Sequence, residues 1–168
     1  MKNRIQLNWI ELSKTQYKEV WDKIDEEMSF KPSITDFPSF KVPSPFITYD
    51  ISDYFGESVD FTVYDDLEEK ALYAFQENIA KNEYMYALDW QHPSYWINPY
   101  LEFEKDEFDQ WTVPIIPNGD YYFFIHKDFE WGFLGHPWEQ TITIFGEALI
   151  KSFEKHLPRM FQKVVRQG

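Results

Sequence analysis

The stretch that decides the fold is PNGDYYFFIHKDFEWGFLGHPWEQTITIFGEALI, residues 117–150. Apolar and aromatic residues at 121–126 and 131–134 flank the short connection 127–130, and this spacing predicts a β-hairpin. Residues 141–145 alternate threonine with apolar side chains, as a half-buried strand does. Gly146 then leads into a predicted helix that runs through about His156.

The chain before this stretch contains two more predicted helices. The first runs from Ser13 to Met28, where apolar residues recur at helical spacing and Ser13 with Gln16 forms a capping-box pattern. The second begins at Asp65 or Asp66 and runs to about Asn82. Between them, four prolines in residues 29–45 exclude a helix interior or a central strand and predict an extended segment.

Three further strands are predicted at 46–51, 59–64 and 84–90. Because several strands follow one another before the last helix, the order of elements favours an antiparallel pattern. We expect an α+β fold with a mixed or mostly antiparallel sheet, about three helices packed mainly on one face in a single layer pair, and one globular domain over residues 1–168.

The composition restricts the classes of function. Aromatic residues make up 20% of the chain, and buried Tyr and Trp need hydrogen-bond partners, so we expect some of them to line a groove. The absence of cysteine excludes disulfides, thiolate metal sites and cysteine nucleophiles. No secretory signal or membrane-spanning segment is recognisable, so we expect a cytoplasmic protein that does not bind membranes.

The formal net charge of −13 is unevenly distributed. Residues 1–150 contain 11 basic and 28 acidic residues, whereas residues 151–168 contain five basic residues and one acidic residue. Such an acidic body repels nucleic acid and favours a basic protein partner. The basic residues of the tail recur every four positions, which predicts one solvated helical face: Lys151, Lys155, Arg159 and Lys163.

No strong catalytic or nucleotide-binding motif is present, so we predict no cofactor and no metal. The two His-Pro steps, at His92 and His136, each follow a predicted strand and could meet in space. Together with Glu139 or Asp89 they could form an acid–base pair or bind a metal. The alternative is that each imidazole only satisfies backbone groups at the end of a strand.

A binding surface is the other use of these segments. Trp96 and Trp138 lie in loops beside the two His-Pro steps and are candidate anchors, because binding energy concentrates in Trp, Tyr and Arg. Asp106, Glu107 and Asp109 would form the acidic rim.

Several stretches resemble those of a known bacterial family. They are Trp9 with Leu12, FKP at 30–32, ALDWQHPSYWINP at 87–99, and the stretch 117–150 quoted above. Together they resemble domain-of-unknown-function family 2716. The resemblance implies a bacterial single-domain protein, and it supplies no activity, cofactor or catalytic residue.

Two hypotheses follow from the sequence. In the first, the chain is a non-enzymatic cytosolic binding protein of the immunity or antitoxin type that occludes a basic toxin. In the second, it is an enzyme of unrecognised type that acts on a small molecule or sugar through His92, His136 and Glu139 in an aromatic pocket. A third hypothesis is a small accessory protein without a catalytic site, and the sequence does not distinguish it from the first.

Overall fold

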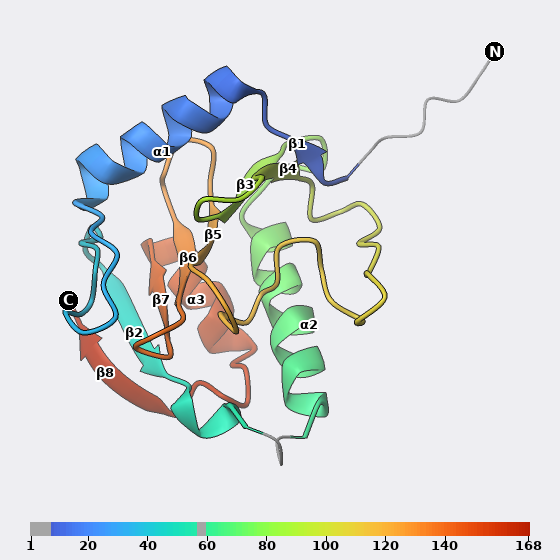
Figure 1. Cartoon of the computed structure of the whole chain (residues 1–168). Helices are drawn as coiled ribbons and strands as arrows, with labels where there is room; N and C mark the ends of the chain where they lie inside the picture. Colours follow the sequence, from blue (N-terminus) through green and yellow to red (C-terminus); the bar gives the residue numbers. More distant parts are fainter. Residues whose placement is uncertain (1–7, 57–59) are drawn as a thin grey trace.

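The structure is a computed structural model, and it describes residues 8–56 and 60–168. Within these residues, eight strands form one antiparallel sheet in the order β1-β4-β3-β5-β6-β7-β2-β8 (Figure 1). The sequence predicted a mixed or mostly antiparallel sheet, and the structure has the antiparallel arrangement. The strands are β1 (Ile10–Glu11), β2 (Phe46–Asp50), β3 (Met85–Asp89), β4 (Tyr95–Ile97), β5 (Tyr122–Ile125), β6 (Gly132–His136), β7 (Thr141–Phe145) and β8 (Lys163–Gln167).

The centre of the sheet is the hairpin that the sequence predicts. β5 pairs with β6 from Tyr122–Gly135 to Ile125–Gly132, and β6 continues into β7 through a tight turn. All residues of these three strands are buried, because both faces of the sheet are covered at this point. Because large apolar side chains occupy consecutive positions in these strands, they point to both faces of the sheet, and both faces must be covered.

Three helices provide this cover, in agreement with the predicted α+β class: α1 (Lys14–Met28), α2 (Thr62–Glu77) and α3 (Glu147–Lys155). The helices α2 and α3 share one face, where Phe124 and Phe133 pack against Phe75. The helix α1 covers the opposite face, where Trp21 packs against Phe123 (Figure 1). Two of the three helices therefore lie on one face, as expected, but α1 covers the other face, so the fold has three layers and not the expected single layer pair.

The local signals for α1 are confirmed in detail. The Ser13 hydroxyl accepts a hydrogen bond from the Gln16 amide at 3.2 Å, and the Gln16 side chain accepts one from the Ser13 amide at 3.0 Å. These two bonds satisfy donors that a helix start otherwise leaves free. The segment after α1 is extended, and its buried Phe30 and Phe40 both contact Phe123.

Several local predictions are wrong. The helix α2 begins at Thr62 and not at Asp65 or Asp66, and Trp96 lies in strand β4 and not in a loop. Residues 62–64 begin α2 and are not part of a strand, while Val59 lies outside the described residues. The basic tail does not form one helical face, because α3 ends at Lys155 and residues 163–167 form the edge strand β8. Pro158 breaks the helix, and Phe161 then stacks on Tyr49 of β2 at 4.3 Å between ring centroids, which aligns the following residues with the sheet.

Candidate functional site

His136, at the end of β6, is completely buried beneath the extended segment that follows α1. Its Nε2 lies 2.9 Å from the Ser39 hydroxyl, and its Nδ1 accepts the Glu139 backbone N–H at 3.1 Å. An acceptor at Nδ1 requires the neutral tautomer with the proton on Nε2. Burial lowers the pKa of His136 to about 4, so the ring is neutral at pH 7.

The carboxylate of Glu139 is also held by hydrogen bonds. It forms two hydrogen bonds with the guanidinium of Arg166, at 2.9 and 2.5 Å, and accepts a third from the Thr141 hydroxyl at 2.8 Å. The side chain is only 12% exposed. His136 and Glu139 therefore lie side by side, as the enzyme hypothesis requires, but both are committed to contacts that hold the fold.

His92 lies in a different cluster. Its Nδ1 is 3.1 Å from Asp89 Oδ1 and 2.9 Å from Asp120 Oδ2. The two carboxylates come from neighbouring strands, since β3 ends at Asp89 and Asp120 precedes β5, and they are mostly buried. The structure thus brings His92 together with Asp89, and not with His136 or Glu139.

Burial and the short distances between the charged groups determine the direction of the pKa shifts in this cluster. Burial, and next the neighbouring Asp120, raise the pKa of Asp89 to about 6, while His92 partly offsets the shift. Hydrogen bonding to Asp89 raises the pKa of His92. Burial and then the two carboxylates also raise the pKa of Tyr122 to about 12. The cluster therefore favours a positive charge near the two aspartates.

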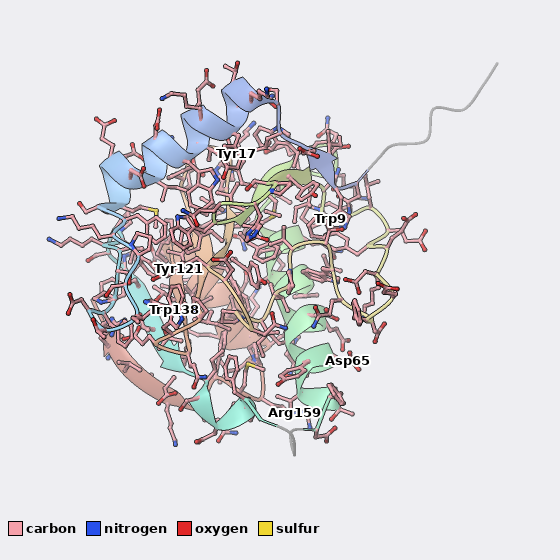
Figure 2. All side chains as sticks on the ribbon, in the orientation of Figure 1. Trp9, Tyr17, Asp65, Tyr121, Trp138 and Arg159 are labelled. Atoms are coloured by element: carbon pink, nitrogen blue, oxygen red, sulfur yellow. The ribbon has the colours of Figure 1, made fainter. Side chains whose placement is uncertain are left out.

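The two predicted tryptophan anchors lie on the α1 side of the sheet. Trp96 is half-buried in β4 and stacks on Tyr86 at 4.2 Å between ring centroids. Trp138 is 42% exposed in the turn after β6, and its ring contacts Tyr121 edge-on at 5.4 Å (Figure 2). Of the two, only Trp138 presents a large part of its ring to solvent.

The three predicted rim acids lie together in the loop that precedes β5. The Asp106 carboxylate accepts the backbone N–H groups of Phe108 and Gln110 at 2.8 and 3.0 Å, so it shapes this loop. Glu107 is exposed, and Asp109 is 80% exposed at its side chain. These acids belong to a surface beside α2, so they do not form one patch with Trp96 and Trp138.

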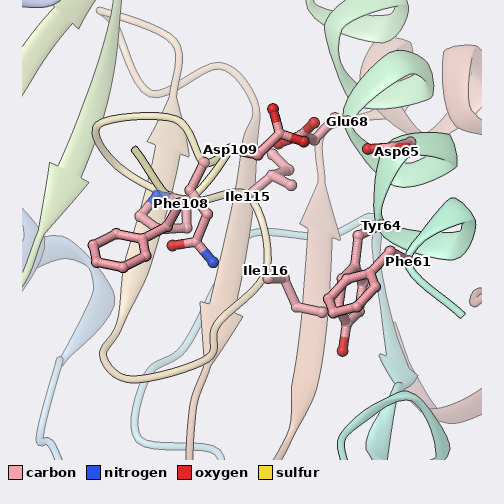
Figure 3. Close-up of a pocket in the computed structure, with 10 residues that line it drawn as sticks. Phe61, Tyr64, Asp65, Glu68, Phe108, Asp109, Ile115 and Ile116 are labelled. Atoms are coloured by element: carbon pink, nitrogen blue, oxygen red, sulfur yellow. The ribbon is translucent and has the colours of Figure 1, made fainter. Parts of the chain in front are cut away.

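A groove lies between this loop and the start of α2 (Figure 3). Its volume is about 430 Å³, and Ile115 and Ile116 form part of its apolar wall. Phe61 and Tyr64 lie on the α2 side, and Phe108 lies on the opposite rim (Figure 3). We call it the acidic groove, because three carboxylates also line it: Asp65, Glu68 and Asp109.

Two features of the acidic groove are unusual. Phe61 is 76% exposed and Phe108 is 74% exposed, the highest values among the large apolar side chains of the described residues. Lys105 contacts Glu68 at 3.1 Å and Asp109 at 3.6 Å, so one cation pairs with two of the three carboxylates. Burial raises the pKa of Glu68, and Lys105 opposes this shift.

Comparisons with known proteins agree with the resemblance seen in the sequence. The family model described as "Protein of unknown function (DUF2716)" matches residues 11–150. The chain belongs to this family. It is also 41% identical over 160 residues to "Uncharacterized protein YxiI" of Bacillus subtilis (strain 168), covering 93% of this chain and 98% of that protein. No solved structure matches the chain.

Sequence reasoning missed three residues of these sites. Asp120 had no recognisable pattern, and its place beside Asp89 follows only from the pairing of β3 with β5. Phe61 belongs to the predicted strand 59–64, where it alternates with Val59 and Val63, so its pattern indicated a half-buried residue. Phe108 lies in the acidic stretch 102–109, which was the available signal that it is exposed. Across 8–56 and 60–168, no helix is long and apolar enough to cross a membrane.

Proposed function

We propose that this family member is a non-enzymatic, cytoplasmic binding protein that occludes a basic protein partner, as an immunity protein or antitoxin occludes a toxin. The observation that carries the proposal is the acidic groove, which is lined by two phenylalanines about three-quarters exposed and by three carboxylates. Exposed apolar groups that are gathered and rimmed by polar residues mark interaction surfaces.

The groove has the chemistry of a partner site with an apolar centre and a charged rim. Phe61 and Phe108 offer apolar surface that a partner side chain would remove from water, and the buried Ile115 and Ile116 form part of the adjoining wall. The acids on the rim would then remain at the edge of the interface, where charges influence the association rate more than the affinity.

The negative charge around the acidic groove indicates which kind of segment it would bind. Segment 102–109 contains five acidic residues and one basic residue, and the chain as a whole carries −13. An acidic segment or nucleic acid would be repelled, whereas a segment with Lys or Arg around one large apolar side chain would be attracted. We therefore assign the groove to a basic segment of a protein partner.

The enzyme alternative has weaker support. It depends on a His/Glu pair that is free to react, and both His136 and Glu139 are held by hydrogen bonds within the fold. A general acid or base must reach its substrate within hydrogen-bond distance, and a completely buried His136 presents no such surface.

The test isolates the partner from native cells with the tagged full chain, and then measures its binding directly with both proteins purified. The groove variant combines Phe61→Ala and Phe108→Ala, and the control is Ile34→Ala, which removes another exposed apolar side chain, 65% accessible. We expect one basic partner whose affinity for the groove variant is at least about 10-fold lower, with the control unchanged.

Charge reversal provides a second, matched comparison. Glu107→Lys with Asp109→Lys alters the rim, and Glu26→Lys with Glu27→Lys makes the same change in net charge on exposed α1. Only the first pair should slow association, and raising salt from about 50 to about 300 mM should reduce this difference. A partner that binds both pairs and the groove variant equally, or the absence of any basic partner, would overturn the proposal.

A further inference from the structure

The cluster of Asp89, His92 and Asp120 suggests a function that is separate from the acidic groove. It combines one imidazole and two carboxylates from two adjacent strand ends, and its ligating atoms all lie within 4.8 Å of one another. A mixed set of one nitrogen and two oxygen donors is typical of sites for divalent first-row metals.

The distances agree with coordination of one ion. Donor atoms that lie 2.0–2.2 Å from a metal ion stand roughly 3.0 to 3.5 Å apart from one another. His92 Nδ1 is 3.1 Å from Asp89 Oδ1 and 2.9 Å from Asp120 Oδ2. These two distances are close to that spacing, and all three ligating atoms lie within 4.8 Å of one another.

The charge of the cluster also calls for a cation. Asp89 and Asp120 are 19% and 12% exposed at their side chains, and two carboxylates that share a mostly buried site repel each other. Within the described part of the chain, no lysine or arginine forms an ion pair with either of them. His92 is the neighbouring group that offsets their charge, and it does so only when protonated.

The fold holds the ligands and leaves an open side. Asp89 closes β3, where its backbone N–H contacts the Ser94 hydroxyl at 3.2 Å, and the Asp120 Oδ1 accepts the Tyr121 N–H at 2.8 Å. His92 is 60% exposed at its side chain and borders a cavity of about 320 Å³ that Tyr17 and Gln91 also line. An ion could thus enter beside His92 and keep water or a small ligand in its remaining positions.

We infer that Asp89, His92 and Asp120 bind one divalent first-row transition-metal ion, with His92 Nδ1 and one oxygen of each carboxylate as ligands. In this arrangement the ion replaces the proton that otherwise joins His92 to the two aspartates. The remaining coordination positions face the cavity beside His92.

The experiment titrates the untagged, chelator-treated full chain with Co²⁺ and, separately, Zn²⁺. We expect one equivalent of Co²⁺ to bind and to give a visible absorption band, and Zn²⁺ to displace it. The variant His92→Ala should weaken binding by about 10-fold or more. Because this side chain is mostly exposed, the variant is expected to fold, which circular dichroism checks.

The molecule offers a matched control. His126, Asp128 and Glu130 form a second group of potential ligands in the β5–β6 connection, and there Asp128 and Glu130 are exposed. Asp128→Asn should leave the affinity unchanged, while Asp89→Asn should lower it. The inference would be overturned if wild-type protein bound no metal, or if His92→Ala bound it as tightly as wild type. Neither result bears on the acidic groove, whose variants involve different residues.

Discussion

The guanidinium of Arg166 binds the carboxylate of Glu139 in a bidentate ion pair, with Nη1–Oε2 at 2.9 Å and Nη2–Oε1 at 2.5 Å. Arg166 belongs to the edge strand β8, and Glu139 lies in the turn between β6 and β7. The pair therefore crosses β7 and β2 and joins the end of the chain to the centre of the sheet. Its side chains are 29% and 12% exposed, so water screens it only in part.

Arg166→Met is expected to lower the free energy of unfolding by about 2 kcal/mol, between the values typical of exposed and of buried pairs. The loss arises because Glu139 would remain mostly buried without its cation. Lys163→Met is the control on the same strand, since Lys163 pairs with Asp53 in solvent and should matter little. Urea denaturation measures both, and equal effects would contradict this role of the Glu139 pair.

The pH dependence of stability should carry a contribution from His136. Burial of the ring lowers the pKa of His136 from 6.5 to about 4 on folding. As the pH falls, the imidazole is therefore protonated in the unfolded chain before it is protonated in the folded protein. This contribution is present above about pH 6.5 and disappears as the pH falls toward 4; it amounts to up to about 3 kcal/mol.

The variant His136→Asn isolates this effect, because all other titrating groups are shared with wild type. The difference in unfolding free energy between the two proteins should shrink as the pH is lowered from 7 to about 4. A difference that stays constant over this range would show that His136 does not titrate with a lowered pKa.

Gly132 allows close packing within β6. A Cβ atom at this position would lie 2.9 Å from Cζ of Phe145, whose ring is buried. Gly132→Ala should therefore lower the melting temperature and cost about 1–3 kcal/mol. At Gly119 the nearest atom, the Tyr122 hydroxyl, is 3.7 Å from the same virtual Cβ, so Gly119→Ala should be tolerated. Similar losses in both variants would rule out this explanation.

The exposed phenylalanines of the acidic groove should contribute little to stability. Phe61→Ala and Phe108→Ala are each expected to change the free energy of unfolding by no more than about 0.5 kcal/mol. Phe75→Ala is the comparison, because its ring is completely buried against Phe124 and its loss should cost about 3–5 kcal/mol. A large loss at Phe61 or Phe108 would mean that these rings serve folding instead of a partner.

Some of the fold could be predicted because its signals are local. The capping box at Ser13 and the hairpin at 121–134 depend on residues close together in the chain, and both are confirmed. The end of α3 was predicted to within one residue, but the conformation of the tail after it was not, because the tail repeats basic residues every four positions as a helix does. The contact of Phe161 with Tyr49, more than 100 positions away in the sequence, decides that this tail joins the sheet.

The candidate sites depended still more on tertiary structure. The sequence singled out His92, His136 and Glu139, but did not reveal that His92 pairs with Asp120 while Glu139 pairs with Arg166. It also identified the acidic loop around Asp109 without the second wall of its groove, which α2 supplies. These contacts follow from strand order and from which helix covers which face.

The sequence by itself determined the α+β class, the principal helices, the central hairpin and the strongly acidic charge, because each depends on composition or on neighbours along the chain. Only the tertiary structure decided that α1 covers the second face, that Asp89, His92 and Asp120 meet at the ends of β3 and β5, and that Phe61 and Phe108 line the same groove. The physical reason is that alternating hydrophobicity defines the two faces of a strand but not its neighbours in the sheet.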